Sequence, residues 1–127
     1  MSKVTYADIQ AYLEAIANNP NNNRDTDSSG HGRFWNVPYN QFINGTVPNE
    51  DCNGNAIRIV DPDPAKCPLY QALKGATGWC NSGQMPMKGP YITAPGYCVK
   101  LADGTNVSGA ETDANLVWWL TIGMPEH

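Results

Sequence analysis

The hydrophobic positions of the chain fall into several short segments separated by polar turns, and the clearest segment lies near the N-terminus. Apolar residues recur there at the helical spacing i, i+3, i+4 and i+7, namely at Ile9, Tyr12, Leu13 and Ile16. Thr5 stands in front of this segment as a helix N-cap, with Asp8 in the first turn. The pattern predicts a helix that begins after Thr5 and ends at Asn18-Asn19-Pro20.

Three further short helices are predicted where turn residues bound apolar positions. The first begins at Asn36 or Val37 and is closed by Gly45, and the second covers residues 68–74. The third is the terminal helix, capped at Thr112-Asp113 and stopped before Pro125. Residues 51–55 are expected to form a turn, residues 56–60 to be extended, and residues 102–104 to form the turn of a small hairpin.

The composition adds a fold class and a domain count to this pattern. The 127 residues are predicted to form a single domain, 1–127, large enough to bury roughly two thirds of the unfolded surface. Glycine and proline are too frequent between Gly75 and Gly109 for long elements. We therefore expect a mainly α domain of short helices joined by long ordered loops.

The charge distribution limits the classes of partner. The net charge is −4, and no stripe of lysine or arginine is present, which argues against nucleic acid and anionic membranes as partners. The longest apolar run, around Leu116 to Ile122, is too short to span a bilayer. No signal peptide is visible at the N-terminus.

The four cysteines, at positions 52, 67, 80 and 98, form no Cys-x-x-Cys pair, so the spacing does not favour a zinc site. An even number of cysteines in a loop-rich chain favours two disulfides and an oxidising compartment. The sequence does not choose among the three connectivities. We therefore expect a disulfide-stapled domain in the periplasm or outside the cell.

The order of the segments resembles a known family. A first helix, the stretch "SSGHG", the stretch "GQMPMKGPY" and a terminal helix "NLVWWLTIGMP" follow one another along most of the chain. In this order they resemble a class I cytochrome c domain. The resemblance implies that His31 and Met85 stand at the positions of the two axial haem ligands, and that the terminal helix packs across the first.

The chain departs from that family where haem would be attached. Asp27 and Gly30 stand where the family has its two cysteines, so no thioether bond to haem can form. His31 and Met85 remain a competent axial pair for a haem bound without covalent bonds. The alternative, which we favour, is that His31 is a hydrogen-bonding loop residue and that Met85 fills core space.

The same region contains residue patterns that suit two metals. Asp25, Asp27 and Ser29 have the alternating spacing of a calcium loop, but Asn36 occupies the position of the bidentate glutamate. Met85 and Met87 with His31 offer soft ligands to copper. In both cases a structural turn or loop is the preferred interpretation, so no metal and no cofactor are expected, with haem and calcium disfavoured.

The functional prediction is a haem-free, cytochrome c-like binding or interaction module. The alternative is a small enzyme or ligand binder that uses the vacated haem cavity, with His31 as general base beside Asp27. The candidate ligand-binding residues are Trp35, Tyr39, Met85 and Tyr91. The expected partner is a small apolar ligand or another protein.

Overall fold

The structure is a computed structural model that describes residues 4–18, 35–52, 54–74 and 91–127, without the side chains of residues 47–52. Helix α1 (Tyr6–Ala17) opens the described chain. Thr5 Oγ1 accepts a hydrogen bond from the Asp8 amide at 3.3 Å, and Asp8 Oδ2 accepts one from the Thr5 amide at 2.9 Å. These two bonds satisfy donors that the first turn leaves without helical partners. The predicted first helix and its cap are therefore confirmed.

A short helix leads into the first hairpin. Helix α3 (Tyr39–Asn44) follows Pro38 and buries Phe42 completely. Strands β1 (Thr46–Cys52) and β2 (Asn55–Arg58) then pair antiparallel, with Cys52 opposite Asn55 and a bulge between Thr46 and Asp51. Gly54, at φ +86°, adopts the left-handed conformation that such a tight connection requires.

The middle of the chain contains two short helical elements. The 3₁₀ helix η2 (Pro64–Lys66) is capped by Asp63, whose carboxylate accepts a hydrogen bond from the Ala65 amide at 3.0 Å. Helix α4 (Pro68–Leu73) follows with proline in its first turn. It buries three apolar side chains, Leu69, Tyr70 and Leu73. This agrees with the helix predicted over residues 68–74.

The second hairpin leads directly into the terminal helix. Strands β3 (Cys98–Lys100) and β4 (Asn106–Ser108) pair antiparallel around the predicted turn at residues 102–104. Helix α5 (Gly109–Thr121) begins at Ser108, whose hydroxyl accepts a hydrogen bond from the Glu111 amide at 3.1 Å. The predicted cap at Thr112-Asp113 is therefore wrong by one turn, because Ser108 provides the capping oxygen earlier in the chain.

Glycine is required at the start of α5. A β-carbon on Gly109 would lie 2.0 Å from the carbonyl oxygen of Ile92. The Gly109 amide also donates to the Tyr97 carbonyl oxygen at 2.8 Å. This close approach fixes the start of α5 against the segment that precedes β3.

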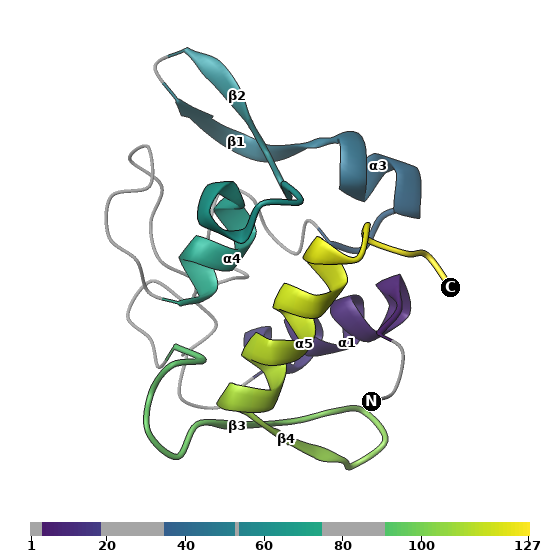
Figure 1. Ribbon diagram of the computed structural model, residues 1–127, viewed down its shortest axis with the longest axis vertical. Helices are drawn as coiled ribbons and strands as arrows, with labels where there is room; N and C mark the ends of the chain where they lie inside the picture. The colour runs from purple at the N-terminus through teal and green to yellow at the C-terminus, as the bar shows by residue number, and fades with distance from the viewer. Residues whose placement is uncertain (1–3, 19–34, 53, 75–90) are drawn as a thin grey trace.

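One hydrophobic core connects these elements. Its largest completely buried side chains come from α1, α3, α5 and the segment before α3, and they are Trp35, Trp119, Phe42, Ile9, Leu13 and Ile16. Helix α5 crosses in front of α1 in Figure 1, and Asn115 Nδ2 donates to Tyr12 Oη at 2.9 Å between the two helices. The predicted packing of the terminal helix across the first is thus present.

The C-terminal tail closes over this core. The Trp119 indole donates from Nε1 to the Pro125 carbonyl oxygen at 2.9 Å, and the Tyr39 hydroxyl donates to the Met124 carbonyl oxygen. The Tyr6 amide donates to the Glu126 carbonyl oxygen at 3.3 Å. The tail therefore connects α1, α3 and α5 after α5 has ended.

The predicted fold class is wrong in two respects. The described residues combine helices with two antiparallel hairpins, so the domain is not mainly α, and nothing in it identifies a cytochrome c-like domain. The strand β1 was missed because residues 46–52 are mostly polar and include Pro48. The short-range pairing of β1 with β2 across a glycine turn outweighs the low strand propensity of these residues.

The prediction of two disulfides is also wrong. Two disulfides would need all four cysteines, but Cys67 and Cys98 are free thiols. Cys67 is completely buried at the start of α4, whereas Cys98 is exposed on β3 beside the buried Val99. The core holds the segment around Cys67 in place, and the β3–β4 hairpin holds the segment around Cys98. Disulfides are therefore not required to fix these two segments.

Candidate binding surface on helix α5

Helix α5 carries apolar residues on two faces. The inner face is buried in the core through Leu116, Trp119 and Leu120. The outer face borders an open groove of about 580 Å³, whose described lining residues are Ala110, Asp113, Ala114, Val117, Trp118 and Thr121. These positions recur at three- and four-residue intervals, so they form one strip along the helix.

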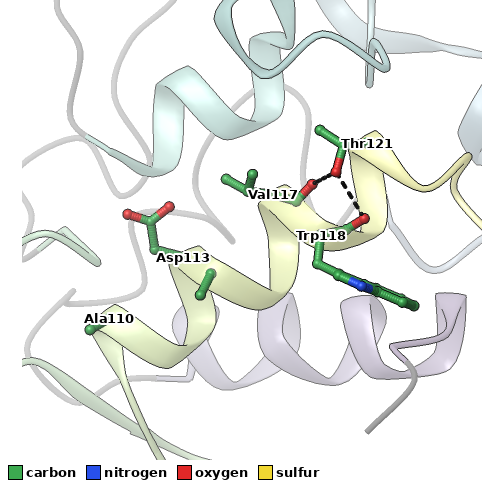
Figure 2. A pocket seen from close by; sticks show the side chains of 6 residues that line it. Ala110, Asp113, Val117, Trp118 and Thr121 are labelled. Atoms are coloured by element: carbon green, nitrogen blue, oxygen red, sulfur yellow. Dashed lines mark hydrogen bonds between the residues drawn. The ribbon is translucent and has the colours of Figure 1, made fainter. Parts of the chain in front are cut away.

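Figure 2 shows how the strip is bounded. Asp113 extends from α5 toward α4, whereas Trp118 extends on the other side toward α1. Ala110 and Ala114 are exposed, and Val117 and Trp118 are half-buried. The small alanine side chains leave the helix backbone accessible between two larger side chains, and this makes the strip concave enough to accept another group.

The strip is apolar apart from one carboxylate. The Thr121 hydroxyl donates to the carbonyl oxygens of Val117 and Trp118, at 2.9 and 3.3 Å, so its polar hydrogen is used within the helix (Figure 2). Ile122, the residue after α5, is 60% exposed and extends the apolar surface at this end. An exposed apolar surface that is continuous along a helix is typical of interaction sites.

The carboxylate of Asp113 is held in place by α4. The Tyr70 hydroxyl donates to Asp113 Oδ1 at 2.6 Å, and Lys74 Nζ lies 5.0 Å from the centroid of the Tyr70 ring. Burial raises the pKa of Tyr70, and the hydrogen bond to Asp113 and the negative charge of that carboxylate raise it further. Tyr70 therefore stays protonated at neutral pH and acts as a fixed donor.

The second oxygen of the same carboxylate has no such partner among the residues that the structure describes. The described residues provide no ion pair to Asp113, and its hydrogen bond with Tyr70 uses only Oδ1. Asp113 itself is half-buried and lines the groove. The site therefore presents one oriented negative charge at the edge of an apolar strip.

The predicted site divides into residues inside and outside the described parts of the chain. His31, Asp27 and Met85 lie outside them, as do the calcium-loop residues Asp25 and Ser29. The catalytic, haem and calcium interpretations of these residues stay predictions. Met87, considered for copper, also lies outside the described residues.

The other predicted ligand-binding residues are described, and none lines the α5 groove. Trp35 is completely buried, and its Nε1 donates to Glu14 Oε1 at 2.7 Å. Tyr39 packs edge-on against Tyr6, with ring centroids 5.5 Å apart and an interplanar angle of 72°. Tyr91 is half-buried near the start of the segment that leads to β3. Trp35 and Tyr39 thus connect α1, α3 and the C-terminal tail. The predicted ligand-binding role of Trp35, Tyr39 and Tyr91 stays a prediction.

The outer strip of α5 was not predicted, although the residues of this segment contain a sign of it. The run from Leu116 to Ile122 is almost entirely apolar, which is more than one buried helix face requires. Dividing it at helical spacing separates Val117, Trp118 and Thr121 from the buried residues.

The described residues also bear on two other classes of site, a metal site and a membrane-spanning helix. No group of three or more histidine, cysteine, aspartate or glutamate side chains is placed there to hold a metal ion. Within the same residues, no helix has the length and apolar character needed to cross a membrane, as the sequence had indicated. Comparison with protein-family models, with curated proteins and with solved structures gave no match to this chain.

Proposed function

We propose that this domain is a binding module and that the outer strip of α5 is its interaction surface. The observation that carries the proposal is the open groove of about 580 Å³ along α5, whose apolar floor ends at the oriented Asp113 carboxylate. Interaction surfaces combine an apolar centre with a few placed polar groups, and the strip has this composition.

The packing of α5 supports the same conclusion. The inner face is fixed by Trp119 and Leu120, which are completely buried, so the outer face is presented on a rigid element. A rigid surface binds with little ordering cost of its own, because its side chains need little rearrangement. Val117 and Trp118 are half-buried and can lose their remaining exposed area to a partner.

A peptide titration followed by NMR tests this function. Three amphipathic helical peptides of about fourteen residues, matched to the length of α5, share the same leucine and alanine face and carry lysine, glutamine or glutamate as polar residues. We expect at least one to shift the amide resonances of Ala110, Ala114, Val117 and Trp118 selectively. If none of the three shifts these resonances, the proposed function is wrong.

A pair of variants makes the test specific for the surface. Ala114→Gln adds bulk to the exposed centre of the strip and uses a good helix former. Ala102→Gln adds the same bulk at an exposed position of the β3–β4 turn. Ala114→Gln is expected to lower the affinity for the peptide about tenfold, because it prevents close approach of the helices. Ala102→Gln is expected to leave the affinity unchanged.

A further inference from the structure

We propose that the partner of this surface is a cationic amphipathic segment of another protein, bound along α5 with a lysine or arginine against Asp113. This inference rests on the proposed function and names the chemistry of its occupant. Three properties of the strip support it, namely its shape, its charge and the small residues at its centre.

The shape of the strip favours a chain segment over a small molecule. All six described lining residues belong to α5, and the strip from Ala110 to Thr121 is about 17 Å long. Within the described part of the chain, this one helix provides a floor that does not enclose a compact ligand, whereas most of a small ligand's surface is buried in a typical pocket. A helix or extended segment can instead lie along the full strip.

The small residues allow such a segment to approach closely. Ala110 and Ala114 are one helical turn apart and exposed, while the larger Val117 and Trp118 follow in the next turn. Helices pack with their axes 8–10 Å apart, at the lower end of this range where small side chains lie in the contact. The partner would place its apolar residues over the alanines and against the Trp118 ring.

The charge of the strip determines which segment fits. Helix α5 contains Glu111 and Asp113 but neither lysine nor arginine. A partner that covered the Asp113 carboxylate without supplying a cation would leave a charge with little water, which is costly. A lysine or arginine at this point would pair with Oδ2, while Tyr70 continues to hold Oδ1.

Among the described residues, the cations of the elements next to α5 do not already fill this role. Lys74, the residue after α4, lies over the ring of Tyr70, and Lys66 on η2 is exposed, but neither forms an ion pair with Asp113. A second copy of this chain fits poorly, because pairing α5 with α5 would bring acidic side chains together on a chain whose net charge is −4. The complementary partner is therefore cationic.

The affinity of the labelled lysine peptide, measured by fluorescence anisotropy, tests the inference. Asp113→Asn removes the charge but keeps an oxygen that can accept the Tyr70 hydrogen bond, so the fold should be preserved. Asp103→Asn removes the same charge from the fully exposed β3–β4 turn, where the carboxylate accepts local hydrogen bonds from the amide and the side chain of Thr105. The two variants therefore have the same net charge and differ only in where the charge is lost.

We expect the lysine peptide to bind at least tenfold more tightly than the glutamate peptide. Asp113→Asn should lower the affinity for the lysine peptide about fivefold, which is the scale of one partly desolvated ion pair. Asp103→Asn should change this affinity by less than a factor of two. If the two variants change the affinity equally, the attraction depends on the net charge of the protein and not on Asp113, and the inference is wrong.

Three further outcomes would also overturn the inference. If the glutamine or glutamate peptide binds as tightly as the lysine peptide at the same strip, the proposed binding function stands, and the inference of a cationic partner is wrong. If sedimentation velocity shows a dimer that Ala114→Gln dissociates, the occupant is a second copy of the chain. If no peptide binds, the proposed function itself fails.

Discussion

Truncation of Trp119 tests the packing that presents the binding surface. The indole is completely buried, lies 6.3 Å from the Phe42 ring between centroids, and donates from Nε1 to Pro125. Replacement by alanine leaves a large cavity and removes the indole hydrogen bond to the tail, while the backbone hydrogen bond from the Met124 amide to the carbonyl oxygen of residue 119 is kept. Tryptophan-to-alanine changes in cores cost about 3–5 kcal/mol, against a total of about 5–15 kcal/mol for most domains.

Urea unfolding followed by far-ultraviolet circular dichroism gives the measurement, because the substitution itself alters the tryptophan fluorescence. With a denaturant slope of about 2 kcal/mol/M, the expected loss shifts the midpoint down by about 2 M. Trp118→Ala is the matched control on the same helix, since Trp118 is only half-buried, and it should cost about 1 kcal/mol. Equal losses for the two variants, or a loss below about 1 kcal/mol for Trp119→Ala, would refute the described core.

Three other predictions follow from particular contacts. Gly109→Ala should destabilise the domain by about 1–3 kcal/mol in the same urea assay, because its β-carbon would collide with backbone. In the native protein an aromatic disulfide reagent should modify Cys98 rapidly and Cys67 only after unfolding, and rapid modification of Cys67 would contradict its burial. The free energy of unfolding should fall as pH rises above about 9. Burial raises the pKa values of Cys67 and Tyr70, so the folded state holds these protons more tightly and loses that stability as they dissociate. A constant free energy of unfolding from pH 8 to 11 would contradict this reasoning.

Local signals in the sequence predicted the elements that depend on neighbouring residues. The first helix could be predicted because Thr5 and Asp8 satisfy each other's backbone donors and the apolar positions follow at helical spacing. The β3–β4 hairpin could be predicted because Gly104 adopts φ +90° in its turn. In both cases a few adjacent residues determine the conformation.

The remaining features depend on contacts between distant segments. Strand β1 has no alternating pattern, and only its pairing with β2 makes it extended. The free thiol of Cys67 follows from its place in the core, where Leu69 donates its amide to the carbonyl oxygen of Ile59 and fixes the start of α4. No periodicity in the sequence contains this information.

The candidate site illustrates the same division. The apolar residues of α5 were recognised, but their separation into a buried and an exposed face depends on where α1 and α4 pack. The role of Asp113 depends on Tyr70, which is 43 positions earlier in the chain. The predicted site at His31 and Met85 lies outside the described residues, so it was neither supported nor excluded.

The most direct test of the central claim is a map of where a cationic amphipathic peptide binds. A lysine peptide that carries a photoreactive benzoylphenylalanine on its apolar face would be cross-linked to the protein, digested with trypsin and analysed by mass spectrometry. Because no lysine or arginine follows Lys100, α5 is contained in the single tryptic fragment 101–127. The account predicts cross-links at Ala110, Ala114, Val117 and Trp118 that are lost in the Ala114→Gln variant. Cross-links confined to other fragments, or unchanged in that variant, would contradict it.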